Sequence, residues 1–310
     1  DVVAVGTPPL AFQWRKDELE LDEATEASLI LTNLQGADAG GYDVVVMNGY
    51  GSVTSAVALL TVNTSLPDSF NPGANGEVDS LAAQVDGRIL VGGRFTMLGG
   101  QSRTNLARVN RDGTIDPSFN PGASGYLVNC LAMQPDGKIV IGGDFTTLGG
   151  QSRTNLGRLN PDGSVDPSFN SGVNGFVSSL LVQADGKLVI GGDFTTLGGQ
   201  SRTRLVRLNP NGTIDPSFIP EAFGRVSSLA LQADGKILVG GRFFMLAREP
   251  RNNLGRLNSD GSLDAAFDPG AEGGDHPSVL ALALQSDGNI LVGGIFTMLG
   301  GQSRTNLGRL

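Results

Sequence analysis

Five arginines recur at the same place in a repeated sequence and are the first candidates for chemistry. Each lies in a loop whose sequence, LGGQSRT, is identical at 98–104, 148–154, 197–203 and 299–305 and is altered at 246–252. The five arginines are Arg103, Arg153, Arg202, Arg251 and Arg304. If the loops share one face of the fold, the guanidinium groups would form a ring that binds a carboxylate or a phosphate. Alternatively, each arginine bonds carbonyl groups or an acid of its own or the neighbouring repeat and so fixes the loop.

A second set of candidates follows a Gly-Gly pair in every repeat and varies within a constant frame. These residues are Arg94, Asp144, Asp193, Arg242 and Ile295. Asp144 and Asp193, in consecutive repeats, are a carboxylate pair that would hold Ca²⁺ or act in acid–base catalysis. Equally, Arg94 and Asp144 would neutralise each other across adjacent repeats.

Two departures from the repeat point to a partner site. The fourth repeat has Ala247–Arg251 in place of the GGQSR portion, and the fifth has a longer leading loop, Gly273–Pro277, which contains His276. If the strand order is right, both loops lie on the face that carries the LGGQSRT loops. Alternatively, both departures are neutral sequence changes in loops that have no function. His276, taken alone, is equally well explained as a solvent-exposed loop residue.

The remaining chemical groups favour structural roles. We expect one arginine per repeat to form a salt bridge within or between repeats: Arg108, Arg158, Arg207, Arg256 and Arg309. Cys130 takes a position held elsewhere by Ser or Ala, which favours a packed thiol over a nucleophile. We therefore predict no catalytic residues, no cofactor and no metal site.

Composition excludes several classes of function. The net charge of −9 divides into −7 in residues 1–62 (nine acids, two bases) and −2 in the remainder (22 acids, 20 bases). Neither part has the basic surface that nucleic acid requires, so we expect no nucleic-acid partner. One cysteine allows no internal disulfide, and one histidine excludes the usual multi-histidine metal sites. No apolar run reaches about 18 residues, so we expect no transmembrane segment.

The candidates are positioned by a repeat of about 49 residues. Its marker phenylalanines are Phe70, Phe119, Phe169, Phe218 and Phe267, at spacings of 49, 50, 49 and 49 residues. Between markers lie short apolar runs bounded by Gly, Asn, Asp or Pro, with Asp-Gly pairs at the turns, which indicates antiparallel strands. Four short strands in such a period predict the blade of a β-propeller.

The register of the repeats predicts five blades in a closed ring. The repeats begin at 66–70 with a fourth-strand segment and end at 306–310 with a third-strand segment, so the two would pair. Because the sequence starts without Met and stops inside a repeat, we expect a fragment that does not contain a signal peptide. Five blades are what this fragment can close, and five, six or seven blades stay open for the parent protein.

Residues 1–62 do not share the repeat and are joined to it by a linker at 63–65. Trp14 and the later D-A-G-G-Y at 38–42 resemble the immunoglobulin-like domain, which implies a β-sandwich with a buried Trp and a tyrosine corner at Tyr42. The two cysteines of that family would fall near Val2 and at Val44. We therefore expect a partial, disulfide-free immunoglobulin-like sandwich whose first strand is clipped.

Residues 66–310 resemble the delta-60 repeat family of large bacterial secreted or surface proteins. The resemblance rests on Q-x-D-G-[KR]-[IL]-[LV]-[VI]-G-G-x-F and L-x-R-[LV]-N-x-[DN]-G-[ST]-[VIL]-D-x-[SA]-F, which recur along the repeats. It implies a propeller-like fold, an extracellular or cell-surface location, and no established activity. Our leading hypothesis is a non-enzymatic binding or adhesion module for a protein or glycan. The alternatives are a propeller glycosidase or lyase, using Asp144, Asp193 and the loop arginines, and a structural spacer.

Overall fold

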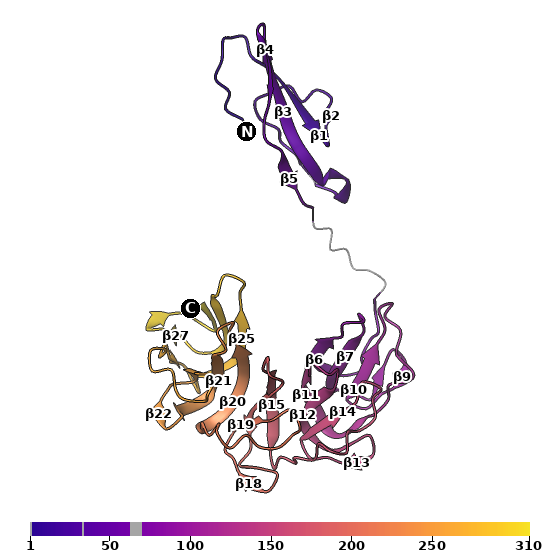
Figure 1. Cartoon of the computed structure of the whole chain (residues 1–310), viewed down its shortest axis with the longest axis vertical. Helices are drawn as coiled ribbons and strands as arrows, with labels where there is room; N and C mark the ends of the chain where they lie inside the picture. Colours follow the sequence, from indigo (N-terminus) through magenta and orange to yellow (C-terminus); the bar gives the residue numbers. More distant parts are fainter. Residues whose placement is uncertain (1, 33, 63–69) are drawn as a thin grey trace. The chain divides into compact units, whose positions relative to one another are not determined.

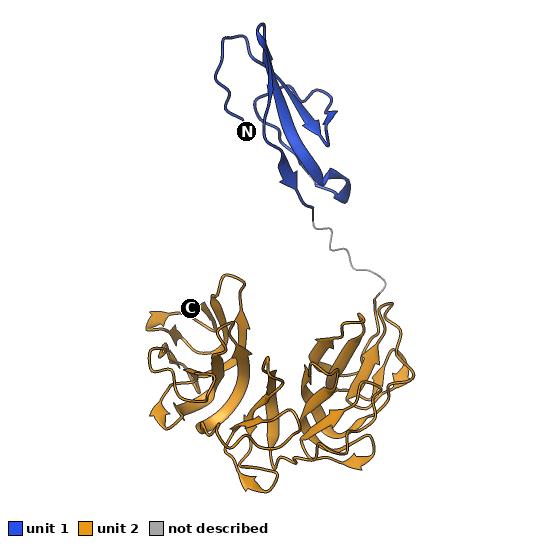
Figure 2. Ribbon diagram, in the orientation of Figure 1, with its two compact units in different colours: residues 1–68 blue, residues 69–310 orange. Residues whose placement is uncertain are grey.

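The computed structural model describes residues 2–32, 34–62 and 70–310 (Figure 1). The chain divides into unit 1, Asp1–Asp68, and unit 2, Ser69–Leu310 (Figure 2). The predicted linker at 63–65 lies outside the described residues. Each unit is considered separately below.

Unit 1 contains one antiparallel sheet with the order β2-β1-β3-β4, in which β5 also pairs with β3. Its elements are β1 (Ala11–Lys16), β2 (Leu19–Glu20), a short 3-10 helix η1 (Gly36–Asp38), β3 (Gly40–Asn48), β4 (Gly51–Thr54) and β5 (Ala58–Leu60). Trp14 and Val44 are buried in its core, with Val2 packed against them. The Tyr42 hydroxyl donates to the Asp38 carbonyl at 2.7 Å, which is the bond of a tyrosine corner. The described residues of unit 1 form no second sheet, so the immunoglobulin-like sandwich stays a prediction.

Unit 2 is all-β and contains the five predicted blades, numbered here 1 to 5 in chain order. The first strands are β6 (Glu77–Ala83), β11 (Ala123–Met133), β15 (Phe176–Val182), β20 (Ala222–Leu231) and β25 (Ser278–Leu284). The second strands are β7 (Ile89–Arg94), β12 (Ile139–Leu148), β16 (Leu188–Asp193), β21 (Ile237–Leu246) and β26 (Ile290–Ile295). The third strands are β10 (Leu106–Val109), β14 (Leu156–Leu159), β19 (Leu205–Leu208), β23 (Leu254–Leu257) and β29 (Leu307–Arg309). In every blade the second strand lies between the first and the third.

The fourth strand is shorter than the sequence indicates. In blade 1 it pairs with the third strand only at Ile115↔Val109, and the same single bridge recurs in blades 2 to 4. The Asp116 carboxylate then accepts bonds from the Ser118 backbone N–H and hydroxyl, which turns the chain away. Pro117, between them, offers no backbone donor to extend the pairing.

The LGGQSRT loops form small hairpins of their own. In blade 1 β8 (Met97–Leu98) pairs with β9 (Gln101–Ser102), and Gly99 and Gly100 supply the positive φ angles, 56° and 72°, of the tight turn. The equivalent short strands are β13 (Gln151–Ser152), β17 (Thr196–Leu197), β18 (Gln200–Ser201), β22 (Glu249–Pro250), β27 (Met298–Leu299) and β28 (Gln302–Ser303). In blade 5 β24 (Ala271–Glu272), from the longer leading loop, pairs with β27. This pairing places the leading loop beside an LGGQSRT loop.

The core of unit 2 is a series of apolar clusters between successive blades. One cluster joins Cys130, Leu156 and Phe169 of blade 2 to Val177 and others of blade 3, and comparable clusters join the other neighbours. Among the described residues the third strand of blade 5, β29, pairs only with β26. Its predicted partner at 66–70 is described only at Phe70, which packs on blade 1. Ring closure therefore stays a prediction.

Candidate functional site

The loop arginines point into the fold rather than forming an exposed ring. Arg103, Arg153 and Arg251 are buried, Arg202 is half-buried, and only Arg304 is exposed. Each donates to the carbonyl of the residue before it, as Arg103 does to Ser102 at 2.8 Å. Arg103 also donates to the Asp116 carbonyl at 3.2 Å. These contacts fix the hairpin to its own blade, and ligand binding by these arginines stays a prediction.

Four of the five third-strand arginines form the expected salt bridges, whereas Arg309 of blade 5 forms none with a described residue. Arg158 is buried and bonds Asp166, the acid of the D-P-S-F motif, at 2.9 Å, and Lys138 reaches the same carboxylate oxygen at 2.9 Å. Arg158 also donates to the Pro210 carbonyl of the next blade. Equivalent Arg–Asp pairs recur in blades 1, 3 and 4. In blades 1 to 4 the motif acid is thus the centre of a clamp, and in blades 1 to 3 the arginine extends the clamp to the next blade.

The clamp lowers the pKa of its carboxylates. Desolvation is the largest single influence on Asp116 and would raise its pKa, but bonds from Ser118 and Arg108 outweigh it. The pKa of Asp116 is therefore well below its usual range, and Asp166 and Asp215 behave in the same way. Burial raises the pKa of the Cys130 thiol, which faces the Val177 carbonyl, so a packed thiol is what the structure contains.

The two aspartates after the Gly-Gly pairs have different surroundings. Asp193 accepts an ion pair from Arg204 of its own blade at 3.2 Å. Arg204 replaces the asparagine found at this position in the other four repeats. The Asp144 carboxylate is exposed and has no hydrogen bond or ion pair to any described residue. Arg94 does not pair with Asp144; it bonds the Tyr126 hydroxyl at 2.7 Å and Glu77 at 3.4 Å.

A hollow lined by two of the predicted residues and by exposed aromatic rings lies between blades 4 and 5. We call it the aromatic groove; its volume is about 570 Å³. Its lining includes Phe223, Arg242, Phe244, Asn252, Glu272 and His276. Arg242 and His276 were both candidates from the sequence, and the structure brings them within 2.8 Å of each other, from the Arg242 guanidinium to Nδ1 of His276. The departure in blade 5 thus contributes His276 to this groove, whereas Ala247–Arg251 of blade 4 does not line it.

Two exposed aromatic rings form the apolar side of this groove. Phe223 is 42% exposed and Phe244 63% exposed. Their ring centroids are 6.2 Å apart and the rings are tilted by 48°. Strand alternation explains the exposure of Phe244. Phe243, the preceding residue of the same strand, points inward and is 3% exposed, so Phe244 points outward. Gly224 lies against the backbone at this point: a Cβ would be 2.1 Å from the Arg242 carbonyl oxygen, so no side chain fits.

The opposite side of the groove is polar. Asn252 donates to Oε1 of Glu272 at 2.7 Å, linking the end of the altered blade-4 loop to the leading loop of blade 5. With the Arg242–His276 contact, this gives the groove paired donors and acceptors beside its two rings. Such a mixture of apolar surface and a few convergent polar groups is typical of ligand sites.

The sequence predicted His276 and Arg242 but missed the aromatic pair. The available signal was the comparison of repeats: Phe244 replaces the Thr at 96, 146, 195 and 297, and Asn252 replaces the Thr at 104, 154, 203 and 305. Ala247 and Arg248, also noticed in the sequence, line a separate hollow with Ile219 and Pro220.

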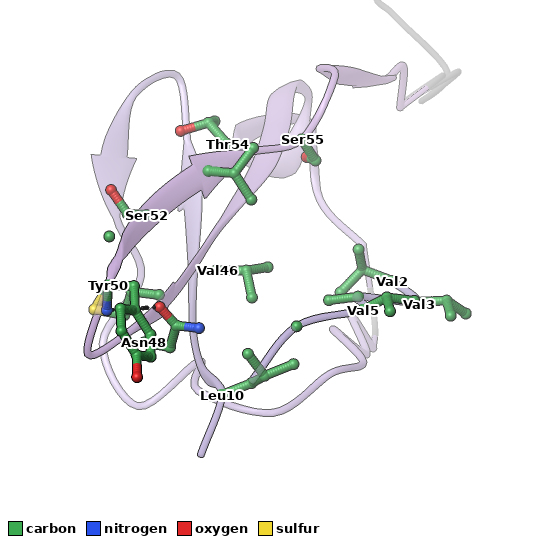
Figure 3. A pocket seen from close by; sticks show the side chains of 15 residues that line it. Val2, Val3, Val5, Leu10, Val46, Asn48, Tyr50, Ser52, Thr54 and Ser55 are labelled. Atoms are coloured by element: carbon green, nitrogen blue, oxygen red, sulfur yellow. Dashed lines mark hydrogen bonds between the residues drawn. The ribbon is translucent and has the colours of Figure 1, made fainter. Parts of the chain in front are cut away.

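A larger hollow, of about 650 Å³, lies in unit 1 (Figure 3). Val46, from β3, points toward Leu10 of the opening segment in Figure 3, with Val2 to one side and Asn48 and Tyr50 at the other end. None of its lining residues carries a charged side chain. It therefore offers packing surface but no acid–base or anion chemistry.

In residues 2–32, 34–62 and 70–310 no three His, Cys, Asp or Glu side chains gather in a way that would hold a metal ion. Over the same part of the chain, no helix has the length and apolar character needed to cross a membrane.

Comparison with known proteins identifies the repeats. The family described as "Domain of unknown function (DUF5122) beta-propeller" matches residues 84–119, 134–169, 183–218, 232–267 and 285–310, about half of the chain. This confirms the resemblance on which the propeller prediction rests. No curated protein matches the chain.

Several solved structures are similar to the chain at low identity. The extracellular domain of a putative one-component system from B. thetaiotaomicron is 15% identical, with a TM-score of 0.46, covering 83% of this chain and 30% of that one. A gluconolactonase from Xanthomonas campestris is 15% identical, with a TM-score of 0.42, covering 84% and 80%. PorZ, a surface component of the type-IX secretion system of Porphyromonas gingivalis, is 13% identical, with a TM-score of 0.41, covering 81% and 36%. The chain thus spans about a third of the first and third of these proteins.

Proposed function

This chain belongs to the DUF5122 β-propeller family, and we propose that its propeller unit is a non-enzymatic module that binds a glycan in the aromatic groove. The single observation that carries the proposal is the exposed Phe223–Phe244 pair facing polar groups of blade 5. Adjacent exposed apolar side chains rimmed by polar residues are typical of interaction and ligand-binding sites.

A sugar ring matches both sides of this groove. Its C–H face is apolar and packs on an aromatic ring, while its hydroxyl groups need donors and acceptors around the edge. Phe223 and Phe244 supply the rings. Arg242, Asn252 and Glu272 supply the polar groups, and their existing contacts hold them in place before a ligand arrives.

A propeller enzyme is the alternative, with Asp144 and Asp193 as its carboxylates. In the structure Asp193 is paired with Arg204, and neither aspartate lines the aromatic groove. No observation places the two carboxylates around one substrate, so the binding module is the better-supported proposal. A structural spacer is the second alternative, and it would need no exposed aromatic pair.

We also propose an extracellular or cell-surface location in a bacterium and a role in adhesion. The sequence resemblance of residues 66–310 to repeats of bacterial secreted or surface proteins supports this location. The partial immunoglobulin-like character of residues 1–62, with its tyrosine-corner bond, supports a multidomain surface protein.

A glycan array, followed by calorimetric titration of each hit, tests the proposal. We expect the 310-residue chain to bind a glycan class, and Phe244→Thr to weaken that binding by about tenfold or more. Thr is the residue of the other four repeats at this position, so this variant preserves the blade. Tyr126→Ala removes a comparably exposed ring between blades 1 and 2 and should leave binding unchanged.

Three outcomes would count against the proposal. The absence of any glycan hit, or equal binding by Phe244→Thr, removes the aromatic groove as a glycan site. Turnover of a bound glycan in a hydrolase and lyase screen, abolished by Asp144→Asn or Asp193→Asn, would favour the enzyme instead.

A further inference from the structure

One pair of opposed residues in blade 4 differs from its equivalents in the other blades. In each blade one residue of the first strand lies directly opposite the residue that follows the Gly-Gly pair on the second strand. These opposed pairs, in blades 1 to 5, are Glu77–Arg94, Leu127–Asp144, Phe176–Asp193, Arg225–Arg242 and Ser278–Ile295. Glu77 and Arg94 neutralise each other, with 3.4 Å between a guanidinium nitrogen and a carboxylate oxygen. Among these five described pairs, only that of blade 4 places like charges opposite each other.

Arg225 and Arg242 are held by neutral groups. Both arginines are exposed, and neither forms an ion pair with a described acid. Arg225 lies over the ring of Phe176, 4.8 Å from its centroid, and donates to the Ser178 hydroxyl at 3.3 Å. Arg242 contacts Nδ1 of His276, and because a guanidinium group only donates, that nitrogen carries no proton in this contact. These contacts orient both arginines without cancelling either charge.

The opposed arginines are unfavourable in the free protein. Like charges directly opposite each other destabilise a pair of antiparallel strands. Proteins tolerate such local conflicts at functional sites, where another requirement outweighs them. An anion bound between the two guanidinium groups would remove the repulsion and accept from their remaining N–H donors. The arrangement therefore favours a ligand with a negative charge.

The arginine pair is continuous with the aromatic groove. Arg242 and Phe244 are two residues apart on β21, so their side chains project from the same face of the blade. Arg225 lies directly opposite Arg242 and projects from that face as well. Arg242 lines the groove together with Phe223 and Phe244, whereas Arg225 lies just outside it. One side of the groove is thus bordered by two positive charges.

We propose that the glycan bound in the aromatic groove is acidic, with its carboxylate or sulfate group held between Arg225 and Arg242. This inference rests on the proposed function and adds to it the class of glycan. The sugar ring packs on Phe223 and Phe244, the oxyanion accepts from both arginines, and ligand hydroxyl groups at the polar side donate to Glu272. A neutral sugar leaves the opposed charges without a counter-ion.

Calorimetric titration of the whole chain with matched pairs of oligosaccharides tests the proposal. The acidic member of each pair carries a hexuronate, a sialic acid or a sulfate ester, and the neutral member is its carboxyl-reduced or desulfated form. We expect an acidic oligosaccharide to bind about tenfold or more tightly than its neutral counterpart. The difference should shrink as sodium chloride rises from about 0.05 to 0.5 M, because salt screens exposed charges. The pair with the largest difference distinguishes a carboxylate ligand from a sulfate ligand.

Variants of the two arginines locate the charge that the acidic glycan meets. Arg225→Glu gives blade 4 the opposed pair of blade 1, in which Glu77 neutralises Arg94, and it leaves the residues that line the groove unchanged. We expect this variant to bind the acidic oligosaccharide about tenfold more weakly, to bind the neutral one unchanged, and to unfold at no lower a temperature than the wild type. Arg242→Gln should also lose the preference for the acidic member. Arg111→Glu is the control for net charge: it alters an exposed arginine of blade 1 and should keep the preference.

The outcomes distinguish this inference from the proposed function. Equal binding of acidic and neutral members overturns the inference, and so does a preference that Arg225→Glu and Arg242→Gln both retain. An equal loss in Arg111→Glu would attribute the preference to net charge and would overturn it as well. In these cases the groove remains a glycan site as long as Phe244→Thr weakens binding. If no glycan of either kind binds, the proposed function and the inference both fail.

Discussion

The guanidinium group of Arg158 lies over the ring of Phe169, with its central carbon 4.5 Å from the ring centroid. The same arginine pairs with Asp166 and reaches the Pro210 carbonyl of blade 3. Blades 1, 3 and 4 repeat the stacking. One arginine side chain therefore contacts a carboxylate, an aromatic ring of the core and a carbonyl group of the neighbouring blade. A planar guanidinium group with several N–H donors can make these contacts together, whereas a lysine ammonium group would not.

Removing the acid of this clamp should destabilise the protein. We expect Asp166→Asn to lower the free energy of unfolding by about 3 kcal/mol, because it leaves the buried Arg158 without its counter-charge. Denaturant unfolding measures the change. Asp144→Asn, in the same blade, alters an exposed carboxylate and should stay within about 0.5 kcal/mol of the wild type. Equal losses for the two variants would contradict the clamp.

The clamp also predicts that the free energy of unfolding falls at acidic pH. The pKa values of Asp116, Asp166 and Asp215 are lower in the folded state than in the unfolded chain, whose aspartates titrate at about 4. Their contribution is therefore complete above about pH 4 and is lost as the pH falls toward the lower folded values. Denaturant midpoints should depend little on these groups between about pH 5 and 7 and fall below about pH 4. Asp166→Asn should show a shallower decline; an unchanged slope would exclude Asp166 as a contributor.

The same Gly→Ala substitution should change stability by different amounts at two equivalent positions, depending on whether a neighbouring blade packs against the glycine. Gly191→Ala would put a Cβ 2.5 Å from Val226, and we expect a loss of about 1–3 kcal/mol from overpacking. Gly293→Ala meets nothing closer than 3.8 Å and should cost much less in dilute solution. Thermal unfolding of both variants gives the comparison. If Gly293→Ala is as destabilising as Gly191→Ala, the space beside Gly293 is filled in solution.

The altered loop of blade 4 carries backbone strain that glycine would relieve. Ala247 and Arg248 have φ angles of 51° and 69°, in the region that favours glycine. We expect Arg248→Gly to raise the free energy of unfolding by about 1 kcal/mol. Its counterpart in blade 2 is Gly150, which has a φ of 73° and open space around it. We expect Gly150→Ala to lower the free energy of unfolding by a similar amount. A loss of stability in Arg248→Gly would show that the Arg248 side chain contributes more than the strain costs.

The sequence predicted the parts of the fold that repeat. Asp-Gly pairs between apolar runs placed the hairpins, and Gly87 and Gly137 have the positive φ angles, 80° and 81°, that the turns require. The marker phenylalanines predicted the blade period because each fills a fixed core position; Phe119 and Phe169 are 0% exposed. Local spacing and burial are enough for these features, since neighbours in sequence are neighbours in the sheet.

The candidate site was only half predictable, because it depends on contacts between blades. His276 and Arg242 are 34 residues apart, and no local pattern indicates that their side chains meet. Phe244 was missed because an aromatic residue in a β-rich sequence is typically a core residue. The pairing of Asp193 with Arg204 was missed because Arg204 interrupts an asparagine position that otherwise fixes the backbone, as Asn105 does for Phe95 and Ala123.

Four glycines lie against a valine of the next blade in the same way: Gly92 with Val128, Gly142 with Val177, Gly191 with Val226 and Gly240 with Val279. This likeness of the four interfaces has a consequence for how such a gene changes. A duplicated or deleted segment of about 49 codons would add or remove a blade whose two sides already fit its new neighbours. Blade number is then free to vary by recombination, with no compensating mutations elsewhere. Selection for a new ligand can act separately, on the few side chains such as Phe244 that no interface between blades uses.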